Sequence, residues 1–404
     1  MVHNSWLIHK LNEISKVTEE NFRNSANVGI VAGISGIALF HFYYSKYLDI
    51  EKHSEIGAEM ISFCFEKINE GYSNPSYCNG IAGLGWAIQH LTTNAFIDVD
   101  CDNLLSQFDG YLYSQMTYDF NQSNYDFLHG ALGYAFYFLS RYEQAEITHL
   151  KKRYESYLSE VLNQLEKLAI EGKKGIKWRS VLDVEKGNEG YNLSLSHGIS
   201  SIINFLTRLH DIDKFSEASK KLLIGGAKYI LSLENATSEN LSLFPSWVEE
   251  GFPREYNSRI AWCYGDLGIG LSLLHAGKSL NDDSLTGRAV EILHHTAKRK
   301  LPHETQVQDA GVCHGSYGNA HIYQRVLRET SQQSFAQPVD FWMEDGIKKA
   351  VFDDGYAGYK QWNGLEKDWK PELSLLEGVA GIGLTIIDYL SEIPNDWDEC
   401  LMIS

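Results

Sequence analysis

Two cysteines and a histidine stand at matching places in two short segments of this 404-residue chain. Cys263 lies in "WCYGDLGIG" (262–270), and Cys313 and His314 lie in "CHGSYGNAHIY" (313–323). In each segment the cysteine stands two places before the first glycine of a glycine-rich motif. Two thiolates and one imidazole are the ligands of catalytic zinc sites, which keep the fourth tetrahedral position open. If the two segments meet in the fold, they predict a site for one Zn²⁺ per chain.

The same glycine motif occurs seven times along the chain. Other copies are "NGIAGLGWAI" from residue 79, "HGALGYAFYF" from residue 129 and "EGVAGIGLTII" from residue 377. The spacings between copies, 47 to 68 residues, leave room for two helices and their loops in each repeat. The first glycines of the copies are Gly33, Gly80, Gly130, Gly198, Gly265, Gly315 and Gly378.

The glycines in the motif have a structural explanation. The order G-x-x-G-x-G at Gly265 resembles a dinucleotide-binding fingerprint in reverse, but no strand is expected before it and no P-loop motif occurs in the chain. Glycine permits a tight turn into a helix and lets neighbouring backbones approach closely. Its recurrence in all seven copies therefore indicates a role in building the fold.

An apolar stretch follows each motif, and a more polar segment lies between motifs. The stretch "LGYAFYFLSRY" (132–142) is typical of a mostly buried helix, whereas residues 152–169 place apolar side chains at amphipathic helical spacing. Seven such pairs predict an all-α fold, an α/α toroid of fourteen helices in two concentric rings. An open solenoid of the same helix pairs is the alternative.

A single domain over residues 1–404 is expected from this pattern. The chain has only seven prolines and no Ser/Gly-rich linker, so no segment marks a domain boundary. The two longest spacings between motifs predict long loops near 171–192 and 238–257, with short strands as an alternative. Loops of this length in a compact domain are often lids or binding elements.

If the repeats close into a ring, equivalent positions of all repeats would lie close together at one end of the ring, around its central opening. Cys263 and Cys313 come from adjacent repeats and would meet there, with His314 beside them. Cys78 has the same register but belongs to the second repeat, so we expect it to face the metal from across the ring. For each residue taken alone, burial in the core is the more common role.

The same geometry selects three more residues. His197 lies one repeat before Cys263, and Asp126 lies one repeat earlier still. A histidine with a nearby carboxylate beside a metal-bound nucleophile is suited to proton transfer at neutral pH. Arg259, four residues before Cys263, could hold a carboxylate or a developing oxyanion. Packing for His197 and solvation for Arg259 are the alternatives.

Composition excludes some classes of partner. The chain has 53 acidic and 35 basic side chains and a formal net charge of -18, which disfavours binding to nucleic acid and to anionic lipid. The first twenty residues carry charges throughout and predict neither a signal peptide nor a membrane span. We expect a cytoplasmic protein that is not an integral membrane protein, and six scattered cysteines suit a reducing compartment.

These motifs resemble those of a known family. The segments "WCYG" (262–265), "CHG" (313–315) and "SHG" (196–198), within seven glycine-marked repeats, are similar to the lanthionine synthetase C-like family of lanthipeptide cyclases. The likeness spans nearly the whole chain. Members of that family add cysteine thiols to dehydroalanine or dehydrobutyrine in ribosomally made peptides, which closes thioether rings.

The resemblance implies roles for eight residues. It implies that three of them are zinc ligands, three are acid/base or active-site residues, and two flank the site and contact substrate. The partner would be a dehydrated lanthipeptide precursor, leader and core together. The chain is similar to stand-alone cyclases, which work with a separate dehydratase and an ABC exporter, and this leaves peripheral attachment to the inner membrane face as an alternative location. The eight residues, in the order of these roles, are Cys263, Cys313 and His314; His197, Asp126 and Arg259; and Trp262 and Tyr264.

The sequence departs from the family pattern at two places. Ser201 stands where the fourth repeat would have its second glycine, and His129 stands where a carboxylate would fit. Two other functions compete with cyclisation. A non-catalytic scaffold could keep the zinc and bind a peptide or glutathione, and a prenyltransferase-like subunit would also activate a thiol on zinc. The latter usually ligates zinc with an aspartate, a cysteine and a histidine, which the two-cysteine set does not match.

Overall fold

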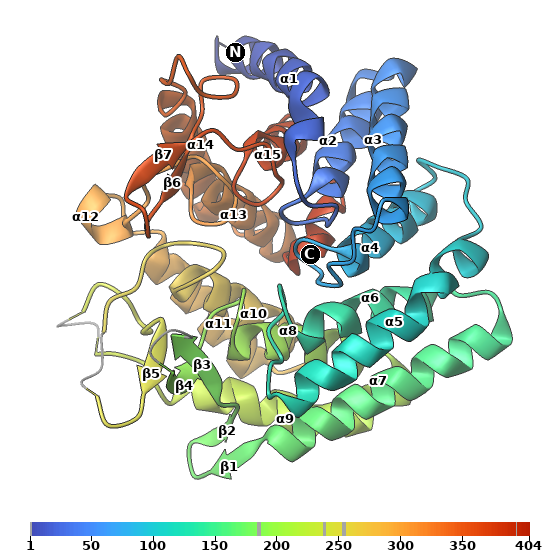
Figure 1. Cartoon of the computed structure of the whole chain (residues 1–404). Coiled ribbons are helices and arrows are strands. Elements are labelled where there is room, and N and C mark those ends of the chain that lie inside the picture. The colour runs from blue at the N-terminus through green and yellow to red at the C-terminus, as the bar shows by residue number, and fades with distance from the viewer. Residues whose placement is uncertain (1, 184–186, 237–239, 253–255, 393) are drawn as a thin grey trace. The chain divides into compact units, whose positions relative to one another are not determined.

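The computed structural model describes residues 2–183, 187–236, 240–252, 256–392 and 394–404 (Figure 1). The chain divides into two compact units. Unit 1 comprises Met1–Tyr113, Ser140–Lys151 and Gln308–Ser404, and unit 2 comprises Ser114–Leu139 and Lys152–Val307. The interpretation of the whole chain as a single domain therefore stays a prediction.

A helix begins directly after the first glycine of each of the seven motifs, and we call these the motif helices. Nearly every side chain of the first two turns is buried in those for which burial is resolved along the helix, as their apolar sequences predict. The prediction of an all-α fold is confirmed. The motif helices are α2 (Ile34–Leu48), α4 (Ile81–Thr93), α6 (Ala131–Gln144), α8 (Ile199–His210), α10 (Asp266–Ser279), α13 (Ser316–Thr330) and α15 (Val379–Leu390).

A second, amphipathic helix follows each of the first six motif helices. Within the units, α2 packs on α3, α8 on α9, α10 on α11 and α13 on α14. In α3 only one stripe of residues is buried, as expected for a helix with one face in the core. These partner helices are α3 (Glu51–Asn69), α5 (Cys101–Asn121), α7 (Thr148–Leu168), α9 (Asp213–Leu231), α11 (Asp283–Thr296) and α14 (Ala336–Lys348).

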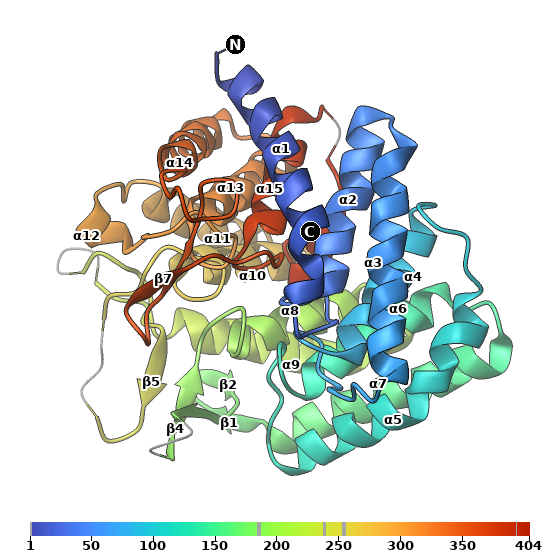
Figure 2. The same cartoon turned by 45° about the horizontal axis from the view of Figure 1, so that its top comes forward.

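The seventh motif helix takes its partner from the other end of the sequence. Helix α1 (Val2–Asn21) packs on α15, and α15 also packs on α2 and α13 (Figures 1 and 2). Leu7, Leu11 and Ile14 of α1 are fully buried. In unit 1 the last repeat is thus joined to the first, which is the arrangement that a closed ring of repeats requires.

Backbone hydrogen bonds join the turns that precede the motif helices of unit 1. The Cys313 N–H donates to the Leu376 carbonyl at 2.8 Å, the Leu376 N–H donates to Val31 at 3.1 Å, and the Ala32 N–H donates to Cys78 at 3.1 Å. The bonds link the sixth, seventh, first and second motifs in that order. They satisfy buried polar groups in turns and tie each motif to the next.

The first glycine of a motif is needed because the turn comes back onto it. A Cβ atom at Gly80 would lie 2.1 Å from the Asn74 carbonyl oxygen, six residues earlier. At Gly265 the corresponding distance, to the Arg259 carbonyl oxygen, is also 2.1 Å, and the φ angle is 96°. A side chain at either position would clash with backbone, and at Gly265 it would also be strained.

Short strands occupy the two segments where long loops are expected. Residues 184–186 of the first segment and 238–239 and 253–255 of the second lie outside the described residues. Strand β4 pairs antiparallel with both β3 and β5, so the two segments meet in one three-stranded sheet of unit 2. The strands are β1 (Ile170–Gly172), β2 (Gly175–Lys177), β3 (Ser180–Asp183), β4 (Asn188–Asn192) and β5 (Trp247–Glu249), with β6 (Gln361–Asn363) and β7 (Asp368–Lys370) in unit 1.

Four short helices complete the described structure: η1 (Phe22–Asn24), α12 (Pro302–Thr305), η2 (Gln333–Phe335) and η3 (Trp397–Leu401). In the described part of the chain, every helix is too short or too polar to cross a membrane.

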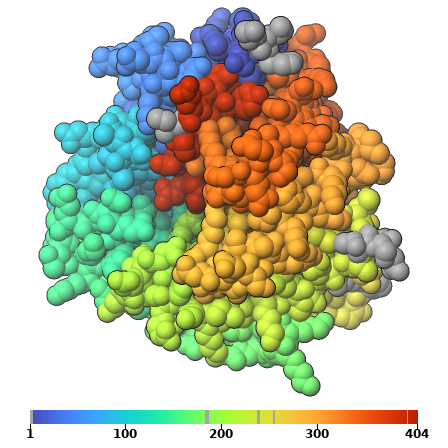
Figure 3. Space-filling view, turned by 180° about the vertical axis from the view of Figure 1, so that it is seen from behind, coloured from blue at the N-terminus to red at the C-terminus, as the bar shows by residue number. Residues whose placement is uncertain are grey.

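The C-terminal segment is held in unit 1 by a buried ionic cluster. Asp398 of η3 is fully buried, and its carboxylate accepts hydrogen bonds from His321 Nε2 at 2.6 Å and from Arg325 Nε at 2.6 Å. Burial alone would raise the pKa of Asp398, but the charges and hydrogen bonds of these partners hold it at about 2. Figure 3 shows the C-terminal residues in red beside the blue N-terminal residues of the same unit.

We expect Asp398→Asn to destabilise unit 1 by about 3 to 5 kcal/mol, because it leaves a buried arginine without its counter-charge. The free energy of unfolding, measured with urea at pH 7, checks this. The exposed neighbour Asp396 provides a control, since Asp396→Asn should change the free energy little.

The folded-state pKa of Asp398 lies below the usual value near 4, so its stabilising effect is complete above about pH 4 and is lost as the pH falls towards 2. The difference in unfolding free energy between the wild type and Asp398→Asn should therefore shrink over that range. A difference that is small at pH 7, or equal at pH 3 and pH 7, would contradict this assignment.

Candidate functional site

Cys263 lies in the turn that leads into α10 in unit 2. Its carbonyl oxygen accepts a hydrogen bond from the Leu195 N–H at 3.0 Å, which ties this turn to the turn before α8. The cysteine is 5% exposed. Gly265 follows two residues later in its positive-φ conformation, and this lets the chain enter the helix directly after the cysteine. The position of Cys263 is therefore fixed by the same type of contact that links the turns of unit 1.

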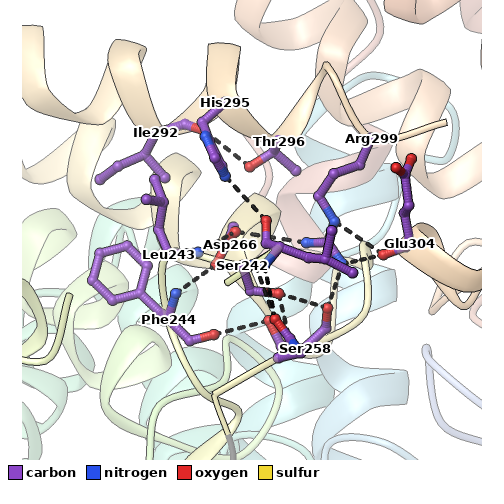
Figure 4. A network of polar contacts seen from close by, with 12 residues as sticks. Ser242, Leu243, Phe244, Ser258, Asp266, Ile292, His295, Thr296, Arg299 and Glu304 are labelled. Carbon is purple, nitrogen blue, oxygen red and sulfur yellow. Dashed lines mark hydrogen bonds and ion pairs between the residues drawn. The ribbon is translucent and has the colours of Figure 1, made fainter. Parts of the chain in front are cut away.

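Asp266, the first residue of α10, anchors the long segment before Cys263 (Figure 4). Its carboxylate is fully buried and accepts hydrogen bonds from the Leu243 and Phe244 N–H groups, both at 2.9 Å. Arg299 Nη1 lies 3.6 Å from the same carboxylate, and Arg299 Nη2 donates to the Ser258 carbonyl at 2.5 Å. The network holds residues 242–244 and 258 against the start of α10, next to the turn with Cys263.

Asp126 and His197 form a hydrogen-bonded pair, also in unit 2. Asp126 Oδ2 lies 2.5 Å from His197 Nδ1, and the two side chains are 20% and 31% exposed. Asp126 Oδ1 also accepts the backbone N–H of His129 at 2.7 Å. The carboxylate thus places the ring proton on Nδ1 of His197 and directs Nε2 away from the pair.

The charge state of His197 follows from this pair. Burial alone would lower the pKa of His197, but the charge and hydrogen bond of Asp126, with a smaller electrostatic effect of Cys263, raise it above the ordinary value. The pKa of Asp126 is lowered: burial opposes ionisation, and the charge and hydrogen bond of His197 outweigh it. The pairing therefore favours the imidazolium form of His197 and the carboxylate form of Asp126.

Tyr264 lies beside this pair. Its ring centroid is 6.1 Å from that of His197 and 6.0 Å from that of Trp247, and its hydroxyl accepts a hydrogen bond from Asn192 Nδ2 at 3.3 Å. Burial raises the pKa of Tyr264, so the phenol stays protonated and can donate a hydrogen bond. Trp247 and Asn192 come from β5 and β4, and Trp247 is 40% exposed. Sequence reasoning selected neither residue, because both lie outside the two positions directly before the glycine where candidate ligands were sought.

The remaining predicted residues of unit 2 lie on the same segment. Arg259 is half-buried, six residues before Gly265, and its carbonyl oxygen faces that glycine. Trp262 is fully buried, and its carbonyl oxygen packs against Gly268. Burial of Trp262 is explained by packing, and a contact of Trp262 or Arg259 with substrate stays a prediction.

Cys313 and His314 lie in the turn that leads into α13 in unit 1. The N–H groups of Val312 and Cys313 both donate to the Leu376 carbonyl, at 2.9 and 2.8 Å. Cys313 is 8% exposed, and the His314 side chain is 14% exposed. His314 Nε2 lies 3.2 Å from Asp309 Oδ2. The turn is thus held by backbone contacts, and the imidazole has a carboxylate partner.

The donor chemistry of these residues fits zinc. Cys263 of unit 2 and Cys313 and His314 of unit 1 each offer one ligand atom of a kind that can hold a metal ion. Thiolate and imidazole ligands favour zinc over the harder cations calcium and magnesium. A histidine that ligates zinc usually donates its other ring N–H to a carboxylate, and Asp309 occupies that place beside His314.

The sequence and fold match one family over nearly the whole chain. The profile of the lanthionine synthetase C-like protein family matches residues 25–402, so the chain belongs to this family. It is 24% identical over 430 residues to the nisin biosynthesis protein NisC of Lactococcus lactis subsp. lactis, covering 98% of this chain and 94% of that protein.

A solved structure of nisin cyclase is also similar. It is 19% identical in sequence, with a TM-score of 0.76, and the match covers 98% of this chain and 97% of nisin cyclase. The similarity in fold agrees with the helix pairs described above and confirms the predicted α/α-toroid fold class.

We expect Asp126→Asn to lower the pKa of His197 to below its ordinary value near 6.5, because the effect of burial then acts without the opposing carboxylate. A pH titration of the His197 ring resonances by NMR measures this. The stabilisation that His197 gains from Asp126 is complete below about pH 6.5 and is lost as the pH rises through the folded-state pKa.

Asp213→Asn, at the exposed start of α9, serves as the control and should leave the His197 titration unchanged. An unchanged His197 pKa in Asp126→Asn would show that the carboxylate does not set the charge of the imidazole.

Proposed function

We propose that this protein is a zinc-dependent lanthipeptide cyclase. It adds cysteine thiols of a dehydrated precursor peptide to dehydroalanine or dehydrobutyrine and forms lanthionine or methyllanthionine rings. Membership of the family and the Cys-Cys-His donor set support this proposal. The observation that carries it is the Asp126–His197 pair near Cys263, because addition to an alkene needs a proton donor next to the place where the thiol is activated.

The metal would be held by Cys263, Cys313 and His314. Bound there, zinc would lower the pKa of a substrate thiol and so supply a thiolate at neutral pH. Three protein ligands would leave room for the substrate sulfur beside them. The low exposure of the two cysteines, 5% and 8%, keeps bulk water from their sulfur atoms.

The addition proceeds without a by-product. The thiolate sulfur forms a bond to the β-carbon of the dehydro residue, and the alkene electron pair moves to the α-carbon and its carbonyl group as an enolate. His197 gives a proton from Nε2 to the α-carbon, because Nδ1 is held by Asp126. The proton lost by the substrate thiol restores the charge of His197, so the sum is thiol plus alkene to thioether.

Two side chains could stabilise the enolate oxygen. Tyr264 carries a protonated phenol close to the ring of His197. Arg259 carries a permanent positive charge on the segment that leads to Cys263. A hydrogen-bond donor lowers the barrier to the addition most when it binds the enolate oxygen more strongly in the transition state than in the bound substrate.

The proposed partners rest on the similarity to stand-alone cyclases. The substrate is a precursor peptide with leader and core that a separate dehydratase has already dehydrated, and an ABC exporter removes the product. The reaction would take place in the cytoplasm, with attachment to the inner membrane face through a complex of these enzymes as the alternative.

Incubation with a dehydrated nisin precursor peptide, followed by thiol alkylation and mass measurement, tests the activity. We expect the wild type to protect the cysteines from alkylation. His197→Ala should react about 100 to 10,000 times more slowly, the usual contribution of a general acid or base, while it keeps its zinc.

A synthetic peptide with one dehydrobutyrine and one cysteine extends the test to substrates other than the nisin precursor. Free thiols after incubation of the wild type with both peptides would contradict the cyclase assignment. Tight binding of either peptide without ring formation would instead identify a zinc-containing scaffold.

Metal analysis of the purified protein should give about one zinc per chain, as three ligands of this type predict. Cys263→Ala and Cys313→Ala should each lose most of it, whereas the buried Cys64→Ala, outside the motifs, should keep it. Full zinc content in either ligand variant would exclude that residue as a ligand.

A further inference from the structure

One register position shows how the turns before the motif helices differ among the repeats. It lies six residues before the first glycine of each motif. Asparagine occupies it in the first four repeats, but the last three repeats have charged residues there. In order, the residues at this position are Asn27, Asn74, Asn124, Asn192, Arg259, Asp309 and Glu372.

The asparagine at this position has a structural task. Asn74 Oδ1 accepts the Ser76 N–H at 3.0 Å, and Asn192 Oδ1 accepts the Ser194 N–H at 3.0 Å. Each bond joins the side chain to the backbone N–H two residues later and so closes a three-residue turn, which asparagine and aspartate side chains commonly do. Asp309 does the same in the sixth repeat, where Oδ1 accepts the Gly311 N–H at 3.3 Å. The turn needs one side-chain oxygen, and an amide is sufficient for it.

The second oxygen of Asp309 has two further contacts. Oδ2 accepts the Trp362 N–H from β6 at 2.9 Å and lies 3.2 Å from His314 Nε2. The side chain is buried, with an exposed fraction of 2%. Lys349 Nζ donates to the Asp309 carbonyl oxygen at 3.0 Å and so fixes the backbone of the same residue. An amide nitrogen in place of Oδ2 would face the Trp362 donor and could not accept from it.

We infer that Asp309 is a positioning residue for the proposed zinc site: its carboxylate accepts the Nε2 proton of His314 and thereby selects Nδ1 as the metal donor. The inference rests on the proposed function, since it assigns a role toward zinc. Neutral imidazole carries one proton, and a carboxylate at Nε2 holds that proton there. Nδ1 then has the lone pair that a metal ligand requires, and the ring is fixed in one orientation.

Asp309→Asn separates this role from the turn. Asparagine keeps the oxygen that closes the turn, as Asn74 and Asn192 show, but it removes the charge and one acceptor. We expect its affinity for zinc to fall about 10- to 100-fold, which is the usual effect of removing such a carboxylate. Competition of the metal-free protein with a chromophoric zinc chelator measures the affinity. Visible spectra of the cobalt-loaded protein should change in the same variant.

Two controls distinguish positioning from general support of the fold. Asn74→Asp puts a carboxylate into the equivalent turn of the second repeat, and it should leave zinc affinity unchanged. Thermal unfolding of the metal-free proteins should give a somewhat lower midpoint for Asp309→Asn, because the Trp362 N–H loses its acceptor, so the midpoint alone does not report the role toward zinc. Long-range ¹⁵N NMR of the metal-free wild type should show the Nε2–H form of His314, with a shift toward Nδ1–H in Asp309→Asn.

The outcomes separate this inference from the proposed function. If Asp309→Asn binds zinc as tightly as the wild type, the role of Asp309 is overturned and the cyclase proposal still stands. Weaker zinc binding with no change in the ring-proton position of His314 between the metal-free wild type and Asp309→Asn would assign Asp309 to support of the fold alone and would also overturn the inference. A wild type that binds no zinc would overturn both.

Discussion

The fold within each unit depends on the backbone hydrogen bonds between successive turns. In unit 1 they run from Cys313 to Leu376, from Leu376 to Val31 and from Ala32 to Cys78, and in unit 2 from Leu195 to Cys263. The turns can approach because the glycine that follows each one has no side chain. The same turns carry the residues two and one places before that glycine. A contact that builds the fold therefore also fixes the candidate ligands.

Much of the fold could be predicted from the sequence, because glycine and apolar periodicity recur in every repeat. The start of each motif helix follows directly from its glycine, and the partner helices follow from their amphipathic spacing. The partner of α15 could not be predicted in this way. It is α1, which carries no motif and lies at the opposite end of the sequence, and only the packing in unit 1 reveals the pairing. The sheet of β3, β4 and β5 likewise joins two segments whose sequences carry no common signal.

The candidate site could be predicted where its residues share the register of the motif. Asp126 and His197 were selected by repeat position, and they lie 2.5 Å apart in unit 2. Asp309, Trp247 and Asn192 were not selected. Aspartate and asparagine are common in turns, and their contacts with His314 and Tyr264 depend on side-chain directions that no spacing specifies. Comparison of one register position across the repeats could have singled out Asp309.

Zinc-edge X-ray absorption of the purified protein shows whether Cys263, Cys313 and His314 bind zinc together, because it reports the atoms bound to the metal. We predict two sulfur ligands at about 2.3 Å and two nitrogen or oxygen ligands at about 2.0 to 2.1 Å, with a third sulfur after addition of a thiol peptide. A shell without sulfur, or with four sulfur atoms before the peptide is added, would contradict this prediction.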